Sequence, residues 1–393
     1  MSSAPRFVLV ANPGCPRLQL FTEALARCGL SPPTVVSWES LLLGSARLEA
    51  VLQPCDCLRL ESPGRDWSVE KLLLKSGAGP AEAEQLPGFL CEARVENLDF
   101  DQGRIWPTRQ WYLGLCRALG GIGEQLEYAH EHFAMQSPSE ILTLFDKPAC
   151  RRRLHAHGVT VPPAIGQGTE WFPANLDDLL ARLREHQWTR VFLKPSHGSS
   201  GVGVVALEFS GERVKATTST EMDVSGGQLR LYSSRRMSVY RTWTEVRRLI
   251  DALCPERLHV ERWWPKASYE GGPCDLRVVT VAGRAWGGVA RIGKGPITNL
   301  HLLNRRASWE QWADHAGASA RDMAMTLAEN AMACFPGTLA GGVDIAFSQG
   351  WNHCAVLEAN AWGDLLKGVS VDGHDCYEAQ IQAVLAKRKA AGR

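Results

Sequence analysis

The stretch Lys194-Pro-Ser-His-Gly-Ser-Ser-Gly-Val-Gly203 decides the fold of this chain. It lies between two β-rich runs, 190–194 and 202–207, so its glycines free a hairpin loop to fold backbone amides over an anion. Lys194 projects from the strand that enters the loop. No Gly-Lys-Ser/Thr opens a helix here and the GxGxxG spacing is absent, which excludes a Walker A loop and a dinucleotide fingerprint. The pattern predicts a lid over phosphates; a flexible glycine hairpin is the plainer alternative.

A second lysine, Lys147, stands in Phe145-Asp-Lys-Pro148, ahead of an arginine-rich helical stretch. Without further context, such a lysine is read as a solvated surface residue. Its order relative to the glycine loop gives it weight, because phosphates are commonly bound by more than one cation. We therefore keep Lys147 as a candidate phosphate ligand.

An acidic hairpin follows later in the chain. Gly342-Val-Asp344 and Val356-Leu-Glu-Ala-Asn360 read as two strands joined across Ser348-Gln-Gly350. The strand period of two puts Glu358 and Asn360 on one face, and cross-strand pairing can bring Asp344 beside them. Carboxylate and amide oxygens are the hard ligands that Mg²⁺ takes alongside the phosphates of a substrate. A solvated hairpin face is the alternative.

Cations lie on the strands between these motifs. Arg277 and Arg291 belong to two β-rich runs joined at Ala282-Gly283, and Lys294 and Asn299 follow in the next loop. Such groups can neutralise charge that grows on a transferred phosphoryl group. The alternative for both arginines is an ion pair with a surface carboxylate.

The composition of the 393 residues excludes several classes of partner. Lys and Arg total 43 against 42 Asp and Glu, so no long-range field attracts nucleic acid or anionic lipid, and we expect neither as a partner. No stretch has the length of a membrane span. Twelve cysteines occur without a CxxC pair, which favours reduced thiols and a cytoplasmic location, as does the absence of a signal-peptide pattern.

The texture of the chain changes near residue 137. Before it, Phe7–Val10 and Cys57–Leu60 are strand-like runs that alternate with helical patterns, which predicts a small parallel α/β domain followed by a long helix, Thr108 to His132. After it, helical stretches and β-hairpins follow each other, and an amphipathic tail, 376–389, ends the pattern.

Taken in order, these motifs resemble the ATP-grasp superfamily. The matching motifs are Lys147, the glycine loop with Lys194, Val260-Glu-Arg-Trp-Trp264, Asp275-Leu-Arg277, Arg291 to Asn299, Asp344 and Glu358-Ala-Asn360. The likeness covers about residues 137–371 and is nearest to the glutathione synthetase and ribosomal-protein glutamate ligase branches. The whole chain is most similar to an uncharacterised bacterial group labelled STM4014-like.

This resemblance implies an α/β and α+β architecture in which two α+β subdomains clamp ATP. The expected units are an N-terminal parallel α/β domain with a helical linker at 1–136, a subdomain with the lysines and phosphate loop at 137–258, and a subdomain with the hinge and metal site at 259–393. Glu61 and Arg65, in the turn after the strand Cys57–Leu60, are candidate substrate contacts from the first unit.

The resemblance also implies the nucleotide and metal contacts. The phosphates would be bound by Lys147, Lys194 and the loop residues Ser199, Ser200, Gly201, Val202 and Gly203, and the adenine by the hinge residues Glu261, Arg262, Trp263 and Trp264. One or two Mg²⁺ ions, with Mn²⁺ as an alternative, would be held by Asp344, Glu358 and Asn360. The tryptophan pair is unusual for such a hinge.

The activity implied is an ATP-dependent carboxylate–amine or carboxylate–thiol ligase that forms an acyl phosphate and releases ADP. Arg291 would stabilise the acyl phosphate and Arg277 the γ-phosphate, and Asn299 and Lys294 would contact substrate. His301-Leu-Leu-Asn-Arg-Arg306 replaces a glycine-rich turn of glutathione synthetase, which implies a changed substrate pocket. Substrates would be a small-molecule or peptide carboxylate and an amine, and the chain a monomer or homodimer. The alternatives are a small-molecule kinase and a non-catalytic nucleotide-binding subunit.

Overall fold

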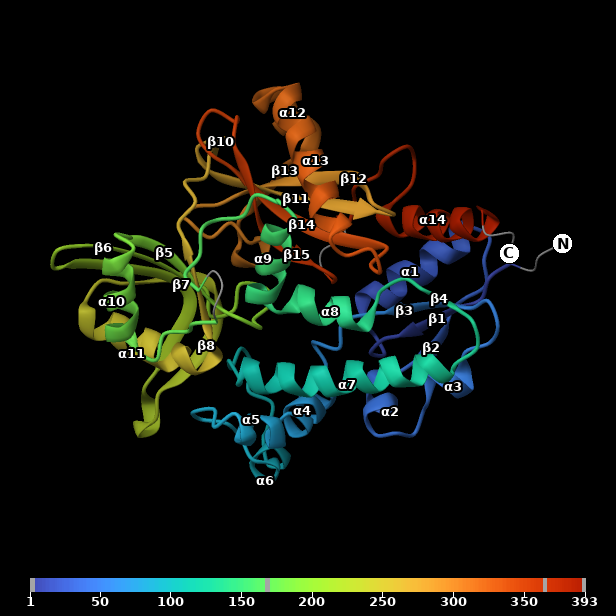
Figure 1. The fold of residues 1–393 in the computed structure, drawn as a ribbon, viewed down its shortest axis with the longest axis horizontal. Coiled ribbons are helices and arrows are strands. Elements are labelled where there is room, and N and C mark those ends of the chain that lie inside the picture. Colours follow the sequence, from blue (N-terminus) through green and yellow to red (C-terminus); the bar gives the residue numbers. More distant parts are fainter. Residues whose placement is uncertain (1–3, 167–169, 363–365, 391–393) are drawn as a thin grey trace.

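The computed structural model describes residues 4–166, 170–362 and 366–390, and these form three β-sheets (Figure 1). The N-terminal sheet has the order β2-β1-β3-β4 and is parallel throughout. All residues of β1 and β3 are buried, as expected for parallel strands with helices on both faces. Its strands are β1 (Phe7–Val10), β2 (Thr34–Val36), β3 (Cys57–Leu60) and β4 (Phe133–Ala134). The parallel α/β unit predicted from the sequence is confirmed.

Helices connect and cover this sheet. They are α1 (Pro16–Arg27), α2 (Trp38–Leu42), α3 (Leu48–Val51), α4 (Trp67–Ser76), α5 (Ala78–Ala83), α6 (Glu92–Glu96) and α7 (Thr108–Tyr128). Helix α7 ends four residues before the predicted His132. It packs tightly on α4, because a Cβ atom at Gly114 would lie 1.9 Å from the backbone oxygen of Leu73. This contact fixes α7 to the N-terminal unit.

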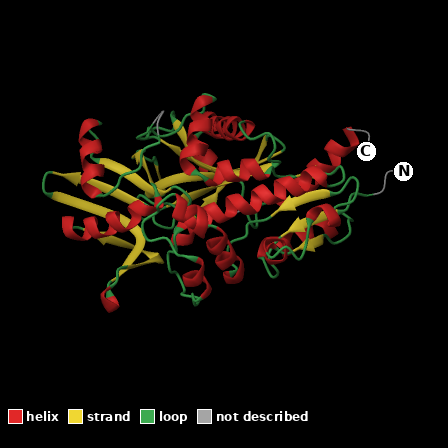
Figure 2. Ribbon diagram, turned by 60° about the horizontal axis from the view of Figure 1, so that its bottom comes forward, coloured by secondary structure: helices red, strands yellow, loops and turns green. Residues whose placement is uncertain are grey.

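The second sheet carries the glycine loop, and we call it the loop sheet. Its order is β8-β7-β6-β5-β9, all antiparallel, and Figure 2 shows its strands gathered at one end of the molecule. Its strands are β5 (Arg190–Pro195), β6 (Val205–Ser210), β7 (Arg213–Asp223), β8 (Arg230–Tyr240) and β9 (Leu258–Arg262). Helices α10 (Leu176–Glu185) and α11 (Trp243–Leu253) share its apolar core. Short 3-10 turns follow β7 at Ser225–Gly227 and α11 at Cys254–Glu256.

The third sheet, which we call the acidic sheet, has the order β13-β12-β11-β14-β15, with β10 paired to β11. The turn between β11 and β12 uses positive φ angles at Ala282 (49°) and Gly283 (79°), as the predicted hairpin requires. Its strands are β10 (Ser268–Tyr269), β11 (Gly272–Val281), β12 (Arg284–Ile292), β13 (Arg305–Ser308), β14 (Ala340–Phe347) and β15 (Cys354–Asn360).

Helices from both sides in sequence cover the acidic sheet. Residues of α8 and α9 join those of α13 in its apolar core, so these two helices pack here although they precede the loop sheet in the sequence. The helices are α8 (Pro138–Phe145), α9 (Lys147–Ala156), α12 (Trp309–Ala316), α13 (Ala318–Ala333) and α14 (Cys376–Ala390), with a 3-10 turn η3 (Leu300–Leu302). Helix α14 returns to pack on α1.

The pairing of β9 bears on where the units divide. Lys194 of β5 lies opposite His259 of β9, so β9 completes the loop sheet, although the sequence suggested that a new unit begins at residue 259. We therefore propose that the division follows Arg262. The β7–β8 hairpin was not predicted, because the buried middle of β7 is a run of polar residues, 217–220, and β8 carries exposed arginines.

Within the three described ranges, no helix has both the length and the apolar character needed to cross a bilayer.

Candidate active site

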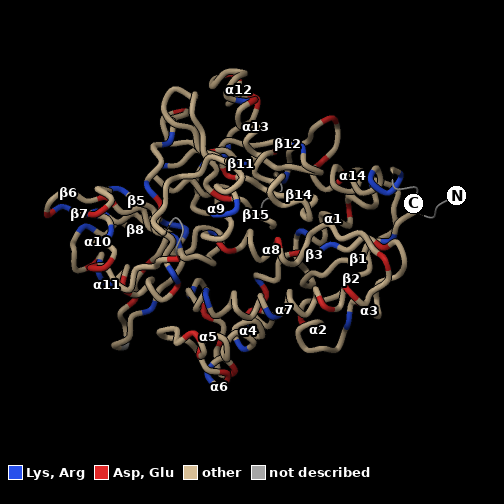
Figure 3. Tube along the Cα trace, viewed as in Figure 1, with Lys and Arg blue, Asp and Glu red and all other residues tan. Residues whose placement is uncertain are grey.

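A cavity lies where the loop sheet, the acidic sheet and α9 meet. It encloses about 770 Å³ of empty space, part of it open to solvent. Its charged lining consists of the cations Lys147, Lys194, Arg262, Lys266 and Arg291 and the carboxylates Glu261, Asp275, Asp344 and Glu358. The formal charge of this lining is therefore +1, and Figure 3 shows charges of both signs meeting around α9 and β15.

Lys194 enters the cavity from the end of β5. Its Nζ lies 2.5 Å from Glu261 Oε2, and His259 Nε2 lies 3.1 Å from the other carboxylate oxygen. The period of two along β9 puts His259 and Glu261 on one face, so both reach Lys194 across the strand pair. Burial opposes the charged carboxylate, but the Lys194 ammonium and the His259 hydrogen bond outweigh it and lower the pKa of Glu261 to about 2.

Lys147 reaches the same cavity from the first turn of α9. Asp146 caps this helix by accepting a hydrogen bond from the Ala149 backbone N–H at 2.9 Å. The Lys147 ammonium donates to the backbone oxygen of Gly198 and lies 3.3 Å from Glu358 Oε1. Burial opposes the charge of Glu358, and Lys147 with Lys194 lowers its pKa below the ordinary value. One lysine thus touches both the glycine loop and the acidic sheet.

The glycine loop faces the cavity with only some of its predicted residues. Of the five predicted loop contacts Gly201 lines the cavity, beside Gly198 and Val204, which were not predicted as contacts, whereas Ser199 and Ser200 are exposed. Among the remaining predicted contacts, Val202 is half-buried outside the lining. Gly203 packs against Pro195, where an added Cβ atom would meet Pro195 Cγ at 2.5 Å. The φ angles of Ser200 (55°), Gly201 (78°) and Gly203 (72°) are all positive.

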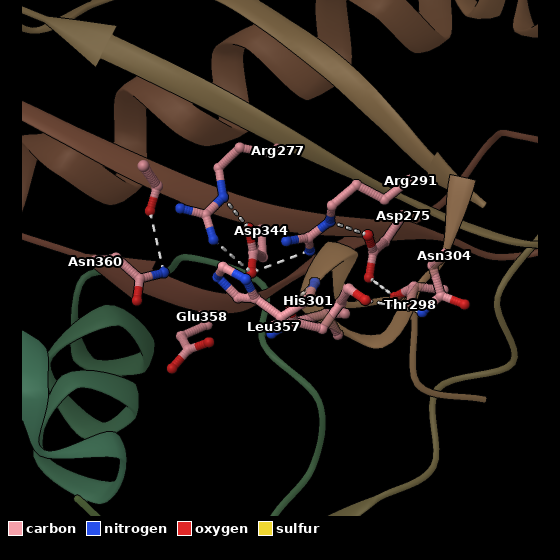
Figure 4. Close-up of polar contacts among 12 residues, drawn as sticks. Asp275, Arg277, Arg291, Thr298, His301, Asn304, Asp344, Leu357, Glu358 and Asn360 are labelled. Atoms are coloured by element: carbon pink, nitrogen blue, oxygen red, sulfur yellow. Dashed lines mark hydrogen bonds and ion pairs between the residues drawn. The ribbon is translucent and has the colours of Figure 1, made fainter. Parts of the chain in front are cut away.

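An interlocked set of ion pairs, of which Asp275, Arg291 and Asp344 line the cavity and the predicted Arg277 does not, forms another wall (Figure 4). Arg291 Nε lies 2.7 Å from Asp275 Oδ1, and its Nη2 lies 3.0 Å from Asp344 Oδ2. Arg277 Nη2 donates to the same Asp344 oxygen at 3.2 Å. The register explains the set, because Asp275 lies opposite Arg291 on β12 and Arg277 lies opposite Asp344 on β14. We call these four residues the arginine–aspartate wall.

The arginine–aspartate wall is extended by groups that the sequence did not single out. Lys266 Nζ donates to Asp275 Oδ2 at 2.9 Å and to Thr298 Oγ1 at 2.6 Å, and Thr298 donates to the same carboxylate. Burial opposes the charge of Asp275, but Arg291 and Lys266 lower its pKa; burial likewise opposes the charge of Arg291, and Asp275 with Asp344 raises its pKa. Asp275 is therefore held as a carboxylate and Arg291 as a guanidinium cation.

The predicted metal ligands lie together at the end of the acidic sheet. Glu358 stands directly opposite Asp344, and Asn360 stands opposite Gly342, to whose backbone oxygen Asn360 Nδ2 donates at 3.5 Å. The amide oxygen of Asn360 is therefore the end available to a cation. Among the described residues, no group of three His, Cys, Asp or Glu side chains could hold a metal, so an Mg²⁺ ion here would use two carboxylates and an amide.

These donors fit Mg²⁺ when substrate phosphates supply the remaining oxygens. Asp344 Oδ1 is buried and makes no hydrogen bond among the described residues, since Arg277 Nε approaches it to 2.5 Å at an unfavourable angle. The Glu358 side chain is 34% exposed against 8% for Asp344, so Glu358 is the carboxylate more open to a cation.

The four predicted hinge residues lie at the end of β9 and just after it, and they do not all reach the cavity. Glu261, Arg262 and Trp264 line the cavity, but Trp263 packs on Phe192 with ring centroids 5.1 Å apart and is not part of the lining. The backbone N–H groups of Arg262 and Trp263 already donate to backbone oxygens, so neither is free for a base. The indole N–H of Trp264 is buried without a hydrogen-bond partner among the described residues.

The predicted substrate residues are scattered. Asn299 lines the cavity and touches the glycine loop near Gly201, whereas Lys294 is exposed and outside the lining. Glu61 lies outside the cavity, buried in ion pairs with Arg59 at 2.6 Å and Arg17 at 3.7 Å. Arg65 is exposed. Glu61 does not line the cavity, because two arginines hold its carboxylate inside the N-terminal unit, and its role as a substrate contact stays a prediction.

Comparison with known proteins gives matches to solved structures only. No protein-family model matches the chain, and no curated protein matches its sequence. The D-cycloserine synthetase DcsG is 15% identical with a TM-score of 0.52, over 97% of this chain and 99% of that one. The ATP-grasp ligase PsnB, in complex with a precursor peptide and AMPPNP, is 14% identical with a TM-score of 0.50, over 99% and 100%.

A third matching structure is that of another synthetase, in complex with ADP. The N5-carboxyaminoimidazole ribonucleotide synthetase purK, in complex with ADP, is 11% identical with a TM-score of 0.55, over 98% of this chain and 77% of that one. Likeness over nearly the whole chain at such low identity shows a shared fold.

Proposed function

We propose that this chain, which has the ATP-grasp fold, is an ATP- and Mg²⁺-dependent ligase that activates a carboxylate as an acyl phosphate and joins it to an amine. The observation that carries the proposal is the meeting of three groups at one cavity. Lys194 and the glycine loop come from the loop sheet, Lys147 comes from α9, and the acidic pair Asp344 and Glu358 comes from the acidic sheet, where Arg291 is ion-paired to Asp344.

In this proposal the nucleotide lies between the two antiparallel sheets. Lys147, Lys194 and the amides near Gly198 and Gly201 bind its phosphates, because each of these residues lines the cavity. The adenine lies toward Glu261 and Trp264, whose indole N–H offers a donor to a ring nitrogen. An ATP molecule carries about four negative charges, so it would more than balance the +1 lining and favour a cation at Glu358.

Bound Mg²⁺, held by Asp344, Glu358 and Asn360, would neutralise the phosphate oxygens during transfer. The cationic side chains of the protein would neutralise the remaining negative charge. A substrate carboxylate oxygen attacks the γ-phosphorus, ADP leaves, and the acyl phosphate forms. The amine then attacks the acyl carbon and phosphate leaves. Arg291 is fixed by two carboxylates, so its remaining N–H groups are held in place before charge develops.

The substrates proposed are a small-molecule or peptide carboxylate and an amine. Two observations support this range: one structural neighbour is a synthetase of a small molecule, D-cycloserine, and another is bound to a precursor peptide. Near-neutral net charge gives no reason to expect a polyanionic substrate.

The test is incubation of the full chain with Mg²⁺-ATP and a desalted pool of cell metabolites and peptides, with mass spectrometry of nucleotides and products. We expect ADP together with a new mass equal to two components minus water. ADP with a mass gain of one phosphate would contradict the ligase and make the chain a kinase. AMP as the nucleotide product would contradict the acyl phosphate.

A further inference from the structure

One histidine of the glycine loop is not exposed like its neighbours but lies beneath the loop. His197 is 3% exposed, whereas Ser199 and Ser200, two and three residues further on, point to solvent. Its ring stacks on Tyr112 of α7, with centroids 3.9 Å apart and planes 22° apart. A loop that must cover a ligand thus begins with a side chain locked in the protein interior.

The imidazole is held through a single nitrogen. His197 Nε2 lies 3.2 Å from Asp146 Oδ2 and 3.3 Å from Arg109 Nη1, whereas Nδ1 is buried with no hydrogen-bond partner among the described residues. Burial lowers the pKa of His197 to about 4, against the opposing effect of Asp146, so the ring is neutral near pH 7. A neutral ring with its proton on Nε2 donates to Asp146, the cap of α9, so Arg109 Nη1 lies beside Nε2 as a neighbouring cation and not as a hydrogen-bond donor to it.

On one side, this contact joins the two phosphate-binding elements. Asp146 precedes Lys147, whose backbone N–H donates to Ser196 at 3.0 Å and whose ammonium donates to Gly198. Residues 196 and 198 flank His197, so three successive loop residues are bonded to the start of α9. The position of the loop relative to Lys147 therefore depends on this junction.

On the other side, the contact reaches the N-terminal unit. Arg109 and Tyr112 belong to the first turns of α7, which runs from beside the loop sheet to the N-terminal sheet (Figure 1). Arg109 is fixed by Glu84 through its Nε at 3.0 Å and its Nη2 at 2.5 Å. Glu256 of the loop sheet side accepts from the Thr108 hydroxyl at 2.7 Å and from the Arg109 N–H at 2.9 Å. The start of α7 is thereby fastened to both units.

We propose that His197 is a positioning residue through which α7 holds the root of the glycine loop against Lys147, so that nucleotide affinity depends on Arg109 and Tyr112 of the N-terminal unit. This inference rests on the proposed function, because it assumes that the loop covers ATP. The serines at the tip of the loop lie in solvent, while its root is bonded to the start of α9 beside the first lysine. A loop without this anchor spends part of its time away from the cavity, and affinity falls by that fraction.

The experiment is titration calorimetry of the full chain with Mg²⁺-ATP, which requires no carboxylate or amine substrate. His197→Phe keeps a flat ring on Tyr112 but removes the N–H, and Arg109→Met removes the guanidinium while keeping an extended side chain. His197→Phe is expected to weaken ATP affinity about tenfold, the loss typical of one hydrogen bond to a charged group, and Arg109→Met to weaken it by a similar factor through loss of the Glu84 bonds that fix the start of α7. The double variant is expected to lose little more than either single variant, because both act through one junction.

A second readout separates positioning from general damage. Hydrogen exchange at 196–204 is expected to accelerate in both variants, while exchange in β1 and β3 stays as in the unmodified chain. His197→Gln, which can offer an N–H toward Asp146, is expected to recover part of the affinity. The matched control is His186→Phe, an exposed histidine 5.1 Å from Trp188 in the loop-sheet unit, which is expected to bind ATP normally.

Two outcomes distinguish a failure of the proposed function from a failure of the positioning role of His197. If the unmodified chain binds no ATP, the proposed function fails and this inference fails with it. If the unmodified chain binds ATP and His197→Phe binds it equally well with unchanged exchange at 196–204, the positioning role is wrong and the proposed function stands.

Discussion

The glycine loop and the arginine–aspartate wall face each other across one cavity, yet they are built in opposite ways. In the wall, Asp275 is 2% exposed and Arg291 and Asp344 are each 6% exposed, and every carboxylate bonds to more than one cation. The loop is held at its root, while the serines at its tip lie in solvent.

This difference separates two tasks. A group that stabilises developing charge gains most from being fixed in advance, because no free energy is then lost in orienting it during the reaction. A group that covers a nucleotide must let it enter and leave, so it is drawn from a less stable part of the fold. We therefore propose that the arginine–aspartate wall stabilises the reacting groups and that the glycine loop closes over the nucleotide. Single substitutions in the wall, in the metal-binding carboxylates and in the loop test this division.

Glu358→Gln removes the carboxylate that is most open to a cation and touches Lys147. We expect Mg²⁺-dependent turnover to fall about 10³-fold, on the order of 4 kcal/mol in the barrier, with little change in melting temperature. Steady-state ADP release measures this loss. The matched control is Glu208→Gln, a carboxylate 29% exposed and 2.8 Å from Lys215, which should turn over normally. Turnover within tenfold of the unmodified rate would remove Glu358 from the metal site.

Arg291→Met breaks the wall itself. It leaves Asp275 and Asp344 buried with one cation fewer, so we expect the free energy of unfolding to drop by about 3–5 kcal/mol. Urea unfolding followed by circular dichroism measures the drop. Lys294→Met, an exposed cation two residues beyond β12, is the control and should change stability by less than about 0.5 kcal/mol. Equal stability of the two variants would show that the wall is not an interlocked unit.

Lys194→Met tests the loop side at the point where we propose that it contacts the nucleotide. We expect ATP affinity to weaken about 10- to 100-fold, measured by titration calorimetry, from loss of one charge-assisted contact. Removing the ammonium also lets the pKa of Glu261 rise from about 2 toward its ordinary 4.5.

The sign of the accompanying pH effect follows from that lowered pKa. A carboxylate with a depressed pKa adds stability that is present above about pH 4.5 and is lost as pH falls toward 2. The stability gap between the unmodified chain and Lys194→Met should therefore be widest above pH 4.5 and narrow in acid. A gap that widens in acid would contradict the Lys194–Glu261 pair.

Ser200→Gly has the smallest expected effect, because it lies at the tip of the loop. Its φ of 55° is unfavourable for serine, but glycine loses more backbone freedom on folding, so the two terms nearly cancel. We expect unfolding free energy to change by less than about 0.5 kcal/mol and ATP affinity by less than about threefold. A tenfold loss of affinity would show that the tip is held as firmly as the wall.

Much of this fold could be predicted because its signals are local. Alternation and turn residues predicted the hairpin at Ala282-Gly283, and the period of two predicted that Glu358 and Asn360 share a face. The turn after β3 was read correctly as a turn. Arg59, two residues before Glu61, could have been recognised as its ion-pair partner, whereas nothing near Glu61 in the sequence shows that Arg17 also holds its carboxylate.

What the sequence missed depends on contacts between distant residues. His197 meets Arg109 across 88 positions and Asp146 across 51, and a lone histidine in a glycine loop gives no sign of either. Lys266 and Thr298 join the wall from loops whose paths are set by the whole sheet. The alternation beyond β9 could have separated Trp264, which lines the cavity, from Trp263, which packs on Phe192.

The most direct test of the central claim follows the oxygen atoms. Once mass analysis has identified the carboxylate substrate, that carboxylate is labelled with ¹⁸O and the reaction is run with unlabelled ATP, amine and water. In an acyl phosphate route, the attacking carboxylate oxygen becomes the bridging oxygen and leaves with phosphate. We therefore expect one ¹⁸O in each phosphate released. Phosphate without label would contradict the acyl phosphate, and label found in AMP would show that the carboxylate is activated at the α-phosphate instead.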